Sequence, residues 1–129
     1  MPLKSNIKSH QKTVLAIGIK DIPCTVEQLP VRLIMAEGAD QALKYLKTET
    51  IDAVLCRWQL HDMLEGLLIK RIIEAKPSMP TIALVDACSP RQEISARTLG
   101  VSMVLPDDIG PEAFGQALSE LLGVAKCNQ

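Results

Sequence analysis

The stretch Thr81–Gly100, which reads TIALVDACSPRQEISARTLG, contains one complete strand and helix unit and decides the fold. It opens with an apolar run without polar alternation, as in a strand that is buried on both faces of a parallel sheet. Ser89 and Gln92 then have the spacing of a capping box, with Pro90 at the first helical position. Gly100 is expected to end the helix. Another apolar run follows at once, so the stretch predicts a strand, a crossover helix and the next parallel strand.

The same alternation extends over the rest of the chain. Apolar runs predict five strands, at Thr13–Ile19, Val31–Ala36, Ala53–Cys56, Thr81–Val85 and Val101–Leu105. Helical stripes follow four of them, at Ala39, Ala42, Leu43 and Leu46, at Leu68, Ile69, Ile72 and Ile73, after Ser89, and at Phe114, Ala117, Leu118, Leu121 and Leu122. The first crossover, Lys20–Pro30, has room for only a shortened helix. The pattern predicts an α/β fold of the (βα)₅ flavodoxin-like type, a three-layer sandwich with a parallel five-stranded sheet of order 2-1-3-4-5.

Length and composition indicate one soluble domain. We expect a mobile basic tail at residues 1–12, a domain at 13–124 and a short C-terminal tail at 125–129. The net charge of −1 gives no general attraction to nucleic acid or to an anionic membrane. No apolar run reaches the length of a membrane span and no secretory signal opens the chain, so we expect a cytoplasmic protein.

Four cysteines, Cys24, Cys56, Cys88 and Cys127, are widely spaced and are expected to be free thiols. The first three and His61 map near one edge of the predicted sheet. Their spacing matches no zinc signature, and buried free cysteines commonly act as small hydrophobic residues. We therefore expect no metal or redox site there.

Several motifs resemble those of response-regulator receiver domains, the phosphate-accepting modules of two-component signalling. They are Asp52–Arg57 with Leu60, Met63 and Gly66, Ala39–Leu43, Met79–Val85, and Leu99–Leu105 with Pro111–Phe114. The resemblance covers about residues 13–123. It implies a signalling module whose site lies at the carboxyl ends of the strands.

The resemblance also implies five positions for a phosphorylation site, and all five depart from the family's pattern. Receiver domains have two acidic residues after the first strand, which hold Mg²⁺, an acceptor aspartate at the end of the third, a threonine or serine at the end of the fourth and a lysine after the fifth. The matching residues here are Gly18, Ile19, Arg57, Val85 and Asp107. Arginine has no nucleophilic oxygen, so Arg57 cannot form an acyl phosphate. We expect a pseudo-receiver without catalytic residues, metal or cofactor.

Arg57 and Asp107 occupy the places of a carboxylate and an ammonium with the two signs exchanged. We expect Arg57 to pair with Asp107, with Asp86 as a second partner, which would hold the loop after the fifth strand in one state. The alternative is that Arg57 extends its guanidinium into water along the rim.

Four residues are candidates for contact with a partner protein: Trp58, Arg91, Arg97 and Asp108. A lone tryptophan in a polar segment is a candidate anchor, although packing over the sheet edge explains it as well. The other three would lie on a face of mixed charge that suits a homodimer.

The sequence predicts a receiver-like signal-transduction module of a two-component or phosphorelay-type pathway, which acts by protein–protein interaction without aspartyl phosphorylation and is not an enzyme. Its partners would be a kinase, a regulator or an output protein. Two alternatives stay open. One is a small flavodoxin-like ligand-binding domain or enzyme, although the loop Ile19–Cys24 lacks the glycines of a phosphate-binding loop. The other is an atypical receiver that is phosphorylated at another acid such as Asp62.

Overall fold

The computed structural model describes residues 12–19 and 30–123. The expectations for the first eleven residues of the basic tail, for a shortened helix within residues 20–29 and for the C-terminal tail lie outside these residues. Cys24 and Cys127 lie outside them too.

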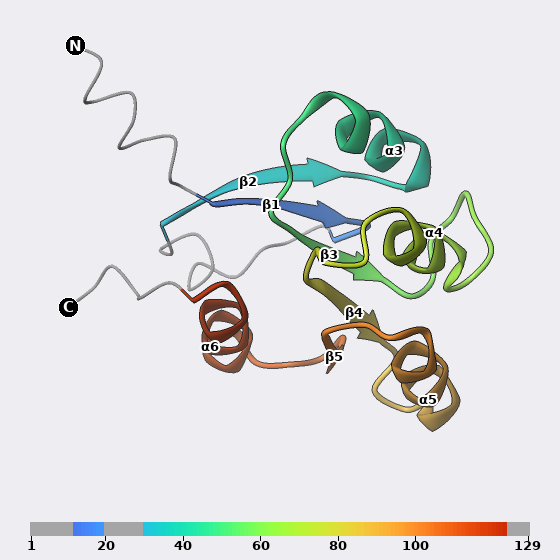
Figure 1. Ribbon diagram of the computed structural model, residues 1–129. Coiled ribbons are helices and arrows are strands. Elements are labelled where there is room, and N and C mark those ends of the chain that lie inside the picture. The colour runs from blue at the N-terminus through green and yellow to red at the C-terminus, as the bar shows by residue number, and fades with distance from the viewer. Residues whose placement is uncertain (1–11, 20–29, 124–129) are drawn as a thin grey trace, which may run out of the picture.

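Five parallel strands form one sheet in the order β2-β1-β3-β4-β5 (Figure 1). They are β1 (Lys12–Ile17), β2 (Val31–Ala36), β3 (Ala53–Arg57), β4 (Thr81–Val85) and β5 (Met103–Pro106). The sheet order and the parallel pairing predicted from the sequence are confirmed. β3 is the central strand, with β1 on one side and β4 on the other.

Three strands differ from the sequence prediction at their ends. β1 begins at Lys12, because this residue already pairs with the first residue of β2. It ends early at Ile17, because Gly18 has a φ of 74° and turns the chain out of the extended conformation. β3 extends to Arg57, which pairs with β4, and β5 begins only at Met103.

The helices of the described residues cover both faces of the sheet. They are α3 (Ala39–Thr48), α4 (Leu67–Ala75), α5 (Pro90–Leu99) and α6 (Pro111–Leu122). Figure 1 shows α3, α4 and α5 on one face and α6 on the other. None of these helices has the length and apolar character that crossing a bilayer requires.

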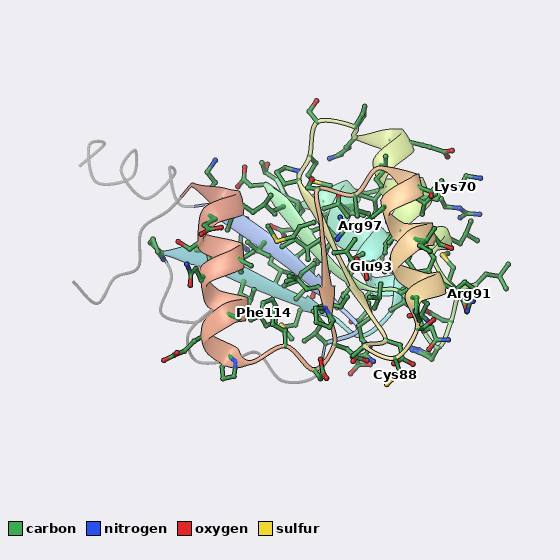
Figure 2. The ribbon with its side chains drawn as sticks, turned by 90° about the horizontal axis from the view of Figure 1, so that it is seen from below. Lys70, Cys88, Arg91, Glu93, Arg97 and Phe114 are labelled. Atoms are coloured by element: carbon green, nitrogen blue, oxygen red, sulfur yellow. The ribbon has the colours of Figure 1, made fainter. Side chains whose placement is uncertain are left out.

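β3 shows how one strand supplies both halves of the core. Successive side chains of a strand point to opposite faces of the sheet. Val54 and Cys56 are therefore buried in the core cluster under α3, α4 and α5, whereas Leu55 is buried with Phe114 and Leu118 of α6. Figure 2 shows Phe114 on the sheet side of α6. Burial on both faces explains why the strand carries no alternation of polar residues.

The turn between β4 and α5 is held by two side chains, in a way that differs in part from a capping box. The Ser89 hydroxyl accepts the backbone N–H of Gln92 at 3.4 Å, as the capping box predicts. The Gln92 side chain does not return to Ser89. Its Oε1 accepts the backbone N–H of Asp86 at 2.8 Å, and Gln92 is buried. The helix cap and the end of β4 are thereby fixed to each other.

Trp58, which follows β3, lies in the core and is only 5 % exposed. Its ring packs against Gly66, where an added Cβ would lie 2.6 Å from the ring. Gly66 also has a φ of 76°, in the left-handed region that disfavours other residues. Trp58 thus packs at the sheet edge, as the second of the two explanations expected, and its role in partner contact stays a prediction.

Two glycine substitutions separate the cost of a left-handed backbone conformation from the cost of a clash with the Trp58 ring. Gly100 has a φ of 93° but open space around its Cβ position, so Gly100→Ala should lower the free energy of unfolding only by the conformational cost of about 1–2 kcal/mol. Gly66→Ala should add an overpacking cost of about 1–3 kcal/mol. Urea unfolding followed by circular dichroism measures both. Equal effects of the two substitutions would contradict the contact between Gly66 and Trp58.

Candidate functional site

The carboxyl ends of the parallel strands meet at one edge of the sheet, where ligands bind in folds of this class. Gly18 directly follows β1, and Arg57 ends β3 opposite Leu84 of β4. The backbone N–H of Asp107 donates to the carbonyl of Val85 at 2.7 Å, which fixes the residue after β5 against the end of β4. The structure thus brings together at this edge the positions singled out in the sequence.

An ion pair joins the ends of β3 and β5. The Nη2 atom of Arg57 lies 3.6 Å from Oδ2 of Asp107. The separation is longer than a good hydrogen bond, and the two side chains keep 42 % and 32 % of their surface exposed. Such a pair contributes little to stability because water screens it. Asp86 does not join it: its Oδ1 accepts the backbone N–H of Cys88 at 2.9 Å.

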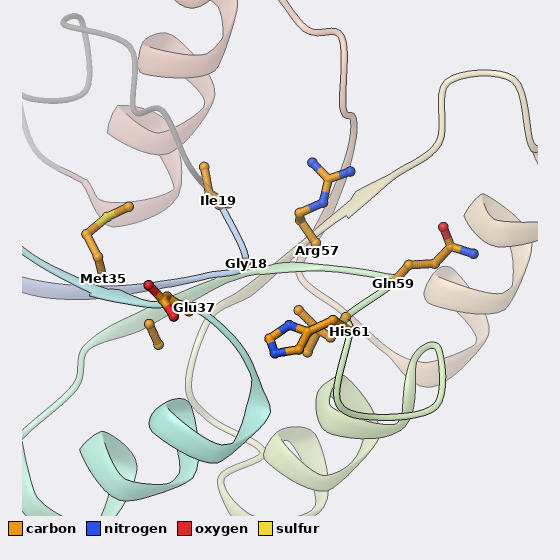
Figure 3. A pocket seen from close by; sticks show the side chains of 9 residues that line it. Gly18, Ile19, Met35, Glu37, Arg57, Gln59 and His61 are labelled. Carbon is orange, nitrogen blue, oxygen red and sulfur yellow. The ribbon is translucent and has the colours of Figure 1, made fainter.

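A cavity of about 690 Å³ lies at the same edge, between the ends of β1, β2 and β3 (Figure 3). Its lining combines apolar and polar side chains: Gly18, Ile19, Met35, Ala36, Glu37, Arg57, Gln59, Leu60 and His61. Figure 3 shows Arg57 and His61 on different sides of this cavity. Among the described residues Glu37 is the one carboxylate of the lining, and the guanidinium of Arg57 brings a fixed positive charge to the cavity. The cavity thus has the size of a small-ligand site with few polar groups.

The positions that match the metal ligands and the hydroxyl of receiver domains are packed and apolar. A Cβ on Gly18 would lie 2.7 Å from Cδ2 of Leu60. Ile19 packs against the core cluster on the α6 side of the sheet, and Val85 is buried. None of these three side chains supplies an oxygen for a hard cation.

Asp62 caps the N-terminus of α3, which begins 23 residues earlier in the chain. Its Oδ1 accepts the backbone N–H of Ala39 at 2.9 Å and its Oδ2 that of Asp40 at 3.1 Å. Gly38, the N-cap residue of α3, has no side chain to do this. The N–H groups of Ala39 and Asp40 hold the pKa of the Asp62 carboxyl below its usual range. Both oxygens of this alternative phosphate acceptor are therefore already engaged.

The thiols form no common site in the part of the chain described here. Cys56 is completely buried, and desolvation by burial raises its pKa to about 12, so the thiol stays protonated at neutral pH. Cys88 is exposed. No group of three His, Cys, Asp or Glu side chains that would suit a metal ion occurs among the described residues.

Glu65 is a residue that sequence reasoning missed. Its Oε1 accepts the indole N–H of Trp58 at 2.8 Å and an N–H of Arg91 at 3.0 Å. These two bonds, with that of Trp58 the larger cause, hold the pKa of Glu65 below its usual range. No local spacing connects a loop glutamate with a helix residue 26 positions later, so only the folded chain shows this link.

The other candidate contact residues lie on the surface. Arg91 pairs with Glu65, and Arg97 pairs with Glu93 at 3.0 Å on the same helix. Both arginine side chains stay largely exposed. Asp108 is exposed as well.

A double-mutant cycle with Arg57→Gln and Asp107→Asn measures the energy of the ion pair. Because the pair is partly exposed, the coupling free energy should be favourable and about 0.2–1 kcal/mol, and it should shrink as salt is added. Chemical unfolding of the wild type, both single variants and the double variant gives this value. A coupling of zero at low salt would show that the two side chains do not interact.

Comparison with known proteins places the fold. No protein-family model and no curated protein matches the chain. The signal receiver domain of an HD domain-containing protein from Pseudomonas fluorescens Pf-5 matches with a TM-score of 0.78 and 22 % identity, over 88 % of this chain and 96 % of that one. A CheY-like response regulator receiver domain protein from Methanospirillum hungatei JF-1 matches with a TM-score of 0.74 and 19 % identity, over 88 % and 94 %. The receiver domain of the Francisella response regulator 1452 matches with a TM-score of 0.75 and 18 % identity, over 88 % of this chain and 98 % of that one. The chain thus has the fold of response-regulator receiver domains.

Proposed function

We propose that the protein is a receiver-like module of a two-component or phosphorelay-type pathway that acts by binding other proteins and takes up no phosphate on an aspartate. One observation carries the proposal. The side chain at the end of the central strand is the guanidinium of Arg57, and it faces the carboxylate of Asp107. The likeness in fold to receiver domains supports the signalling role.

The chemistry of these groups opposes phosphorylation in two ways. An acyl phosphate needs a carboxylate nucleophile, and Arg57 offers only nitrogen donors that stay protonated. A Mg²⁺ ion needs several oxygen ligands, whereas Gly18 and Ile19 offer no side-chain oxygen. The fixed positive charge of Arg57 also repels a divalent cation from the same cavity.

The ion pair gives the loop after β5 a contact that does not depend on phosphate, and its small energy biases the loop toward one state. In receiver domains the lysine after the fifth strand pairs with the phosphoryl group, so the loop responds to phosphorylation. Here Asp107 pairs with a side chain of the protein itself. Partner binding would then depend on the concentrations and affinities of the proteins, such as a kinase, a regulator or an output protein, and the module would act in the cytoplasm.

Incubation with acetyl phosphate and Mg²⁺, followed by intact-mass spectrometry, tests the proposal. The wild type should gain no phosphoryl group, while a receiver domain with an acceptor aspartate, treated in parallel, should gain one. The variant Arg57→Asp/Asp107→Lys restores two of the five family positions but no metal ligands at Gly18 and Ile19, and it should stay unmodified too.

Asp62→Asn is the matched variant for the alternative acceptor. A phosphoryl group that appears on the wild type and is missing from this variant would place phosphorylation on Asp62 and overturn the proposal. A phosphoryl group that persists in the variant would equally overturn it and would point to another acid.

The cavity beside Arg57 favours a second candidate, a small-ligand-binding domain. Its volume of about 690 Å³ falls within the usual range of ligand sites. A thermal-shift screen with FMN, nucleotides and cyclic dinucleotides decides between the two, because a true ligand stabilises the folded state by mass action. A saturable rise in the melting temperature that Arg57→Gln abolishes would favour this candidate.

A further inference from the structure

A groove between α4 and α5 exposes two large apolar side chains. Leu64 is 78 % exposed and Ile94 is 65 % exposed. Among the described residues Met35 is the remaining exposed large hydrophobic residue, and it lies on β2. Single exposed apolar residues are normal on protein surfaces. Leu64 and Ile94, however, line the same groove, which has a volume of about 410 Å³.

Hydrogen bonds through Glu65 link the two walls of this groove. Trp58 and Leu99 line its buried part, and Leu64, Glu65 and Lys70 line it on the α4 side. The indole N–H of Trp58 donates to Glu65, which also accepts the N–H of Arg91 on α5. The buried wall at Trp58 is thereby preorganised, and binding to a preorganised surface loses less free energy.

Lys70, Glu65 and the nearby Arg91 give the rim of the groove a small net positive charge. Lys70 lines it and forms no ion pair with any described residue. Arg91 pairs with Glu65, whose carboxylate also accepts the indole N–H of Trp58. The helices α4 and α5 each carry two basic residues and one acidic residue. Figure 2 shows Lys70 and Arg91 on the outer side of the molecule.

We propose that this groove binds an acidic amphipathic segment of a partner protein. Apolar side chains of the segment would cover Leu64 and Ile94, and its carboxylates would lie near Lys70 and Arg91. The proposal deepens the proposed function and rests on it only in taking the partner to be a protein. It names the surface of contact, which is distinct from the sheet edge that carries Arg57.

Charge disfavours two other occupants. In a symmetric dimer through this groove, the same patch of both copies would meet, so two rims of the same net positive charge would face each other. The N-terminal residues 1–11 carry Lys4 and Lys8 and no acidic residue, so their charge has the same sign as the rim. An acidic segment from another protein is the complementary choice.

A random peptide library displayed on phage, panned against the wild-type chain and counter-selected on Leu64→Ala/Ile94→Ala, tests this. The enriched peptides should combine apolar residues at helical spacing with Asp or Glu. Trp58 is the one tryptophan of the chain and lines the groove, so synthetic copies of these peptides should change its fluorescence on binding. Calorimetry gives the affinities.

The variants have matched controls. Leu64→Ala/Ile94→Ala should weaken peptide binding roughly tenfold or more, whereas Met35→Ala removes an exposed apolar residue elsewhere and should leave binding unchanged. Lys70→Glu should weaken binding, and Lys47→Glu, the same charge change on α3, should not. Circular dichroism confirms that each variant is folded.

Three results would overturn the proposal: no enriched peptide, enriched peptides that are basic, or peptides that bind Leu64→Ala/Ile94→Ala as tightly as the wild type. Sedimentation analysis of the chain without peptide tests whether a second copy of the chain occupies the groove. A dimer that Leu64→Ala/Ile94→Ala abolishes would replace the acidic partner by the chain itself. None of these results bears on phosphorylation, so the proposed function and the docking surface fail or stand separately.

Discussion

Parallel pairing of β3, β4 and β5 is the constraint on which the candidate site depends, because it brings three successive strand ends to one edge. Neighbouring strands lie about 4.8 Å apart, so the ends of β3 and β5 are roughly 10 Å apart across β4. The long side chain of Arg57 crosses that gap to reach Asp107. Val85, at the end of the strand between them, is apolar and buried and offers no competing polar group. The position of each residue follows from the strand register and requires no special loop.

The exchange of charges that we propose would change what this edge can do while leaving the fold intact. A sheet that is buried on both faces obtains its stability from apolar contacts in two core clusters. Arg57 and Asp107 at its carboxyl edge contribute little to that stability, because their side chains are partly exposed. The edge is therefore free to carry a guanidinium in place of a carboxylate, and likeness in fold does not fix the chemistry at the edge.

Much of the fold was predictable because its signals are local. Apolar runs, helical stripes and the cap at Ser89 all lie within short windows, and they indicated alternating strands and helices and hence a parallel sheet. The strand order was taken from the usual arrangement of flavodoxin-like folds of this length. The sequence predicted that the site residues lie at the carboxyl edge of the sheet, but it did not predict all of their contacts. Asp62 caps α3 from 23 positions away, and Glu65 joins Trp58 to Arg91 across two elements. Such contacts depend on tertiary structure, and no spacing in the sequence reveals them.

Trp58 links the two surfaces of functional interest. It follows Arg57 in the chain, and its backbone N–H donates to the carbonyl of Leu84 at 2.8 Å. Its indole N–H donates to Glu65, beside the groove of Leu64 and Ile94. The sheet edge and the groove are therefore built on adjacent residues of one strand end. A tryptophan in a polar segment suggests an exposed anchor, but its burial gives the molecule a rigid connection instead.

Magnesium and beryllofluoride titrations, followed by ¹H–¹⁵N NMR spectra of the folded chain, test the central claim most directly. Beryllofluoride mimics an aspartyl phosphate where a carboxylate and Mg²⁺ are in place, and a receiver domain activated in this way is among the structures that share this fold. The amide signals of Gly18, Arg57 and Asp107 should keep their positions through millimolar additions of both. Saturable shifts centred on these three residues would contradict the account, because they would show that the edge still assembles a metal and phosphate site.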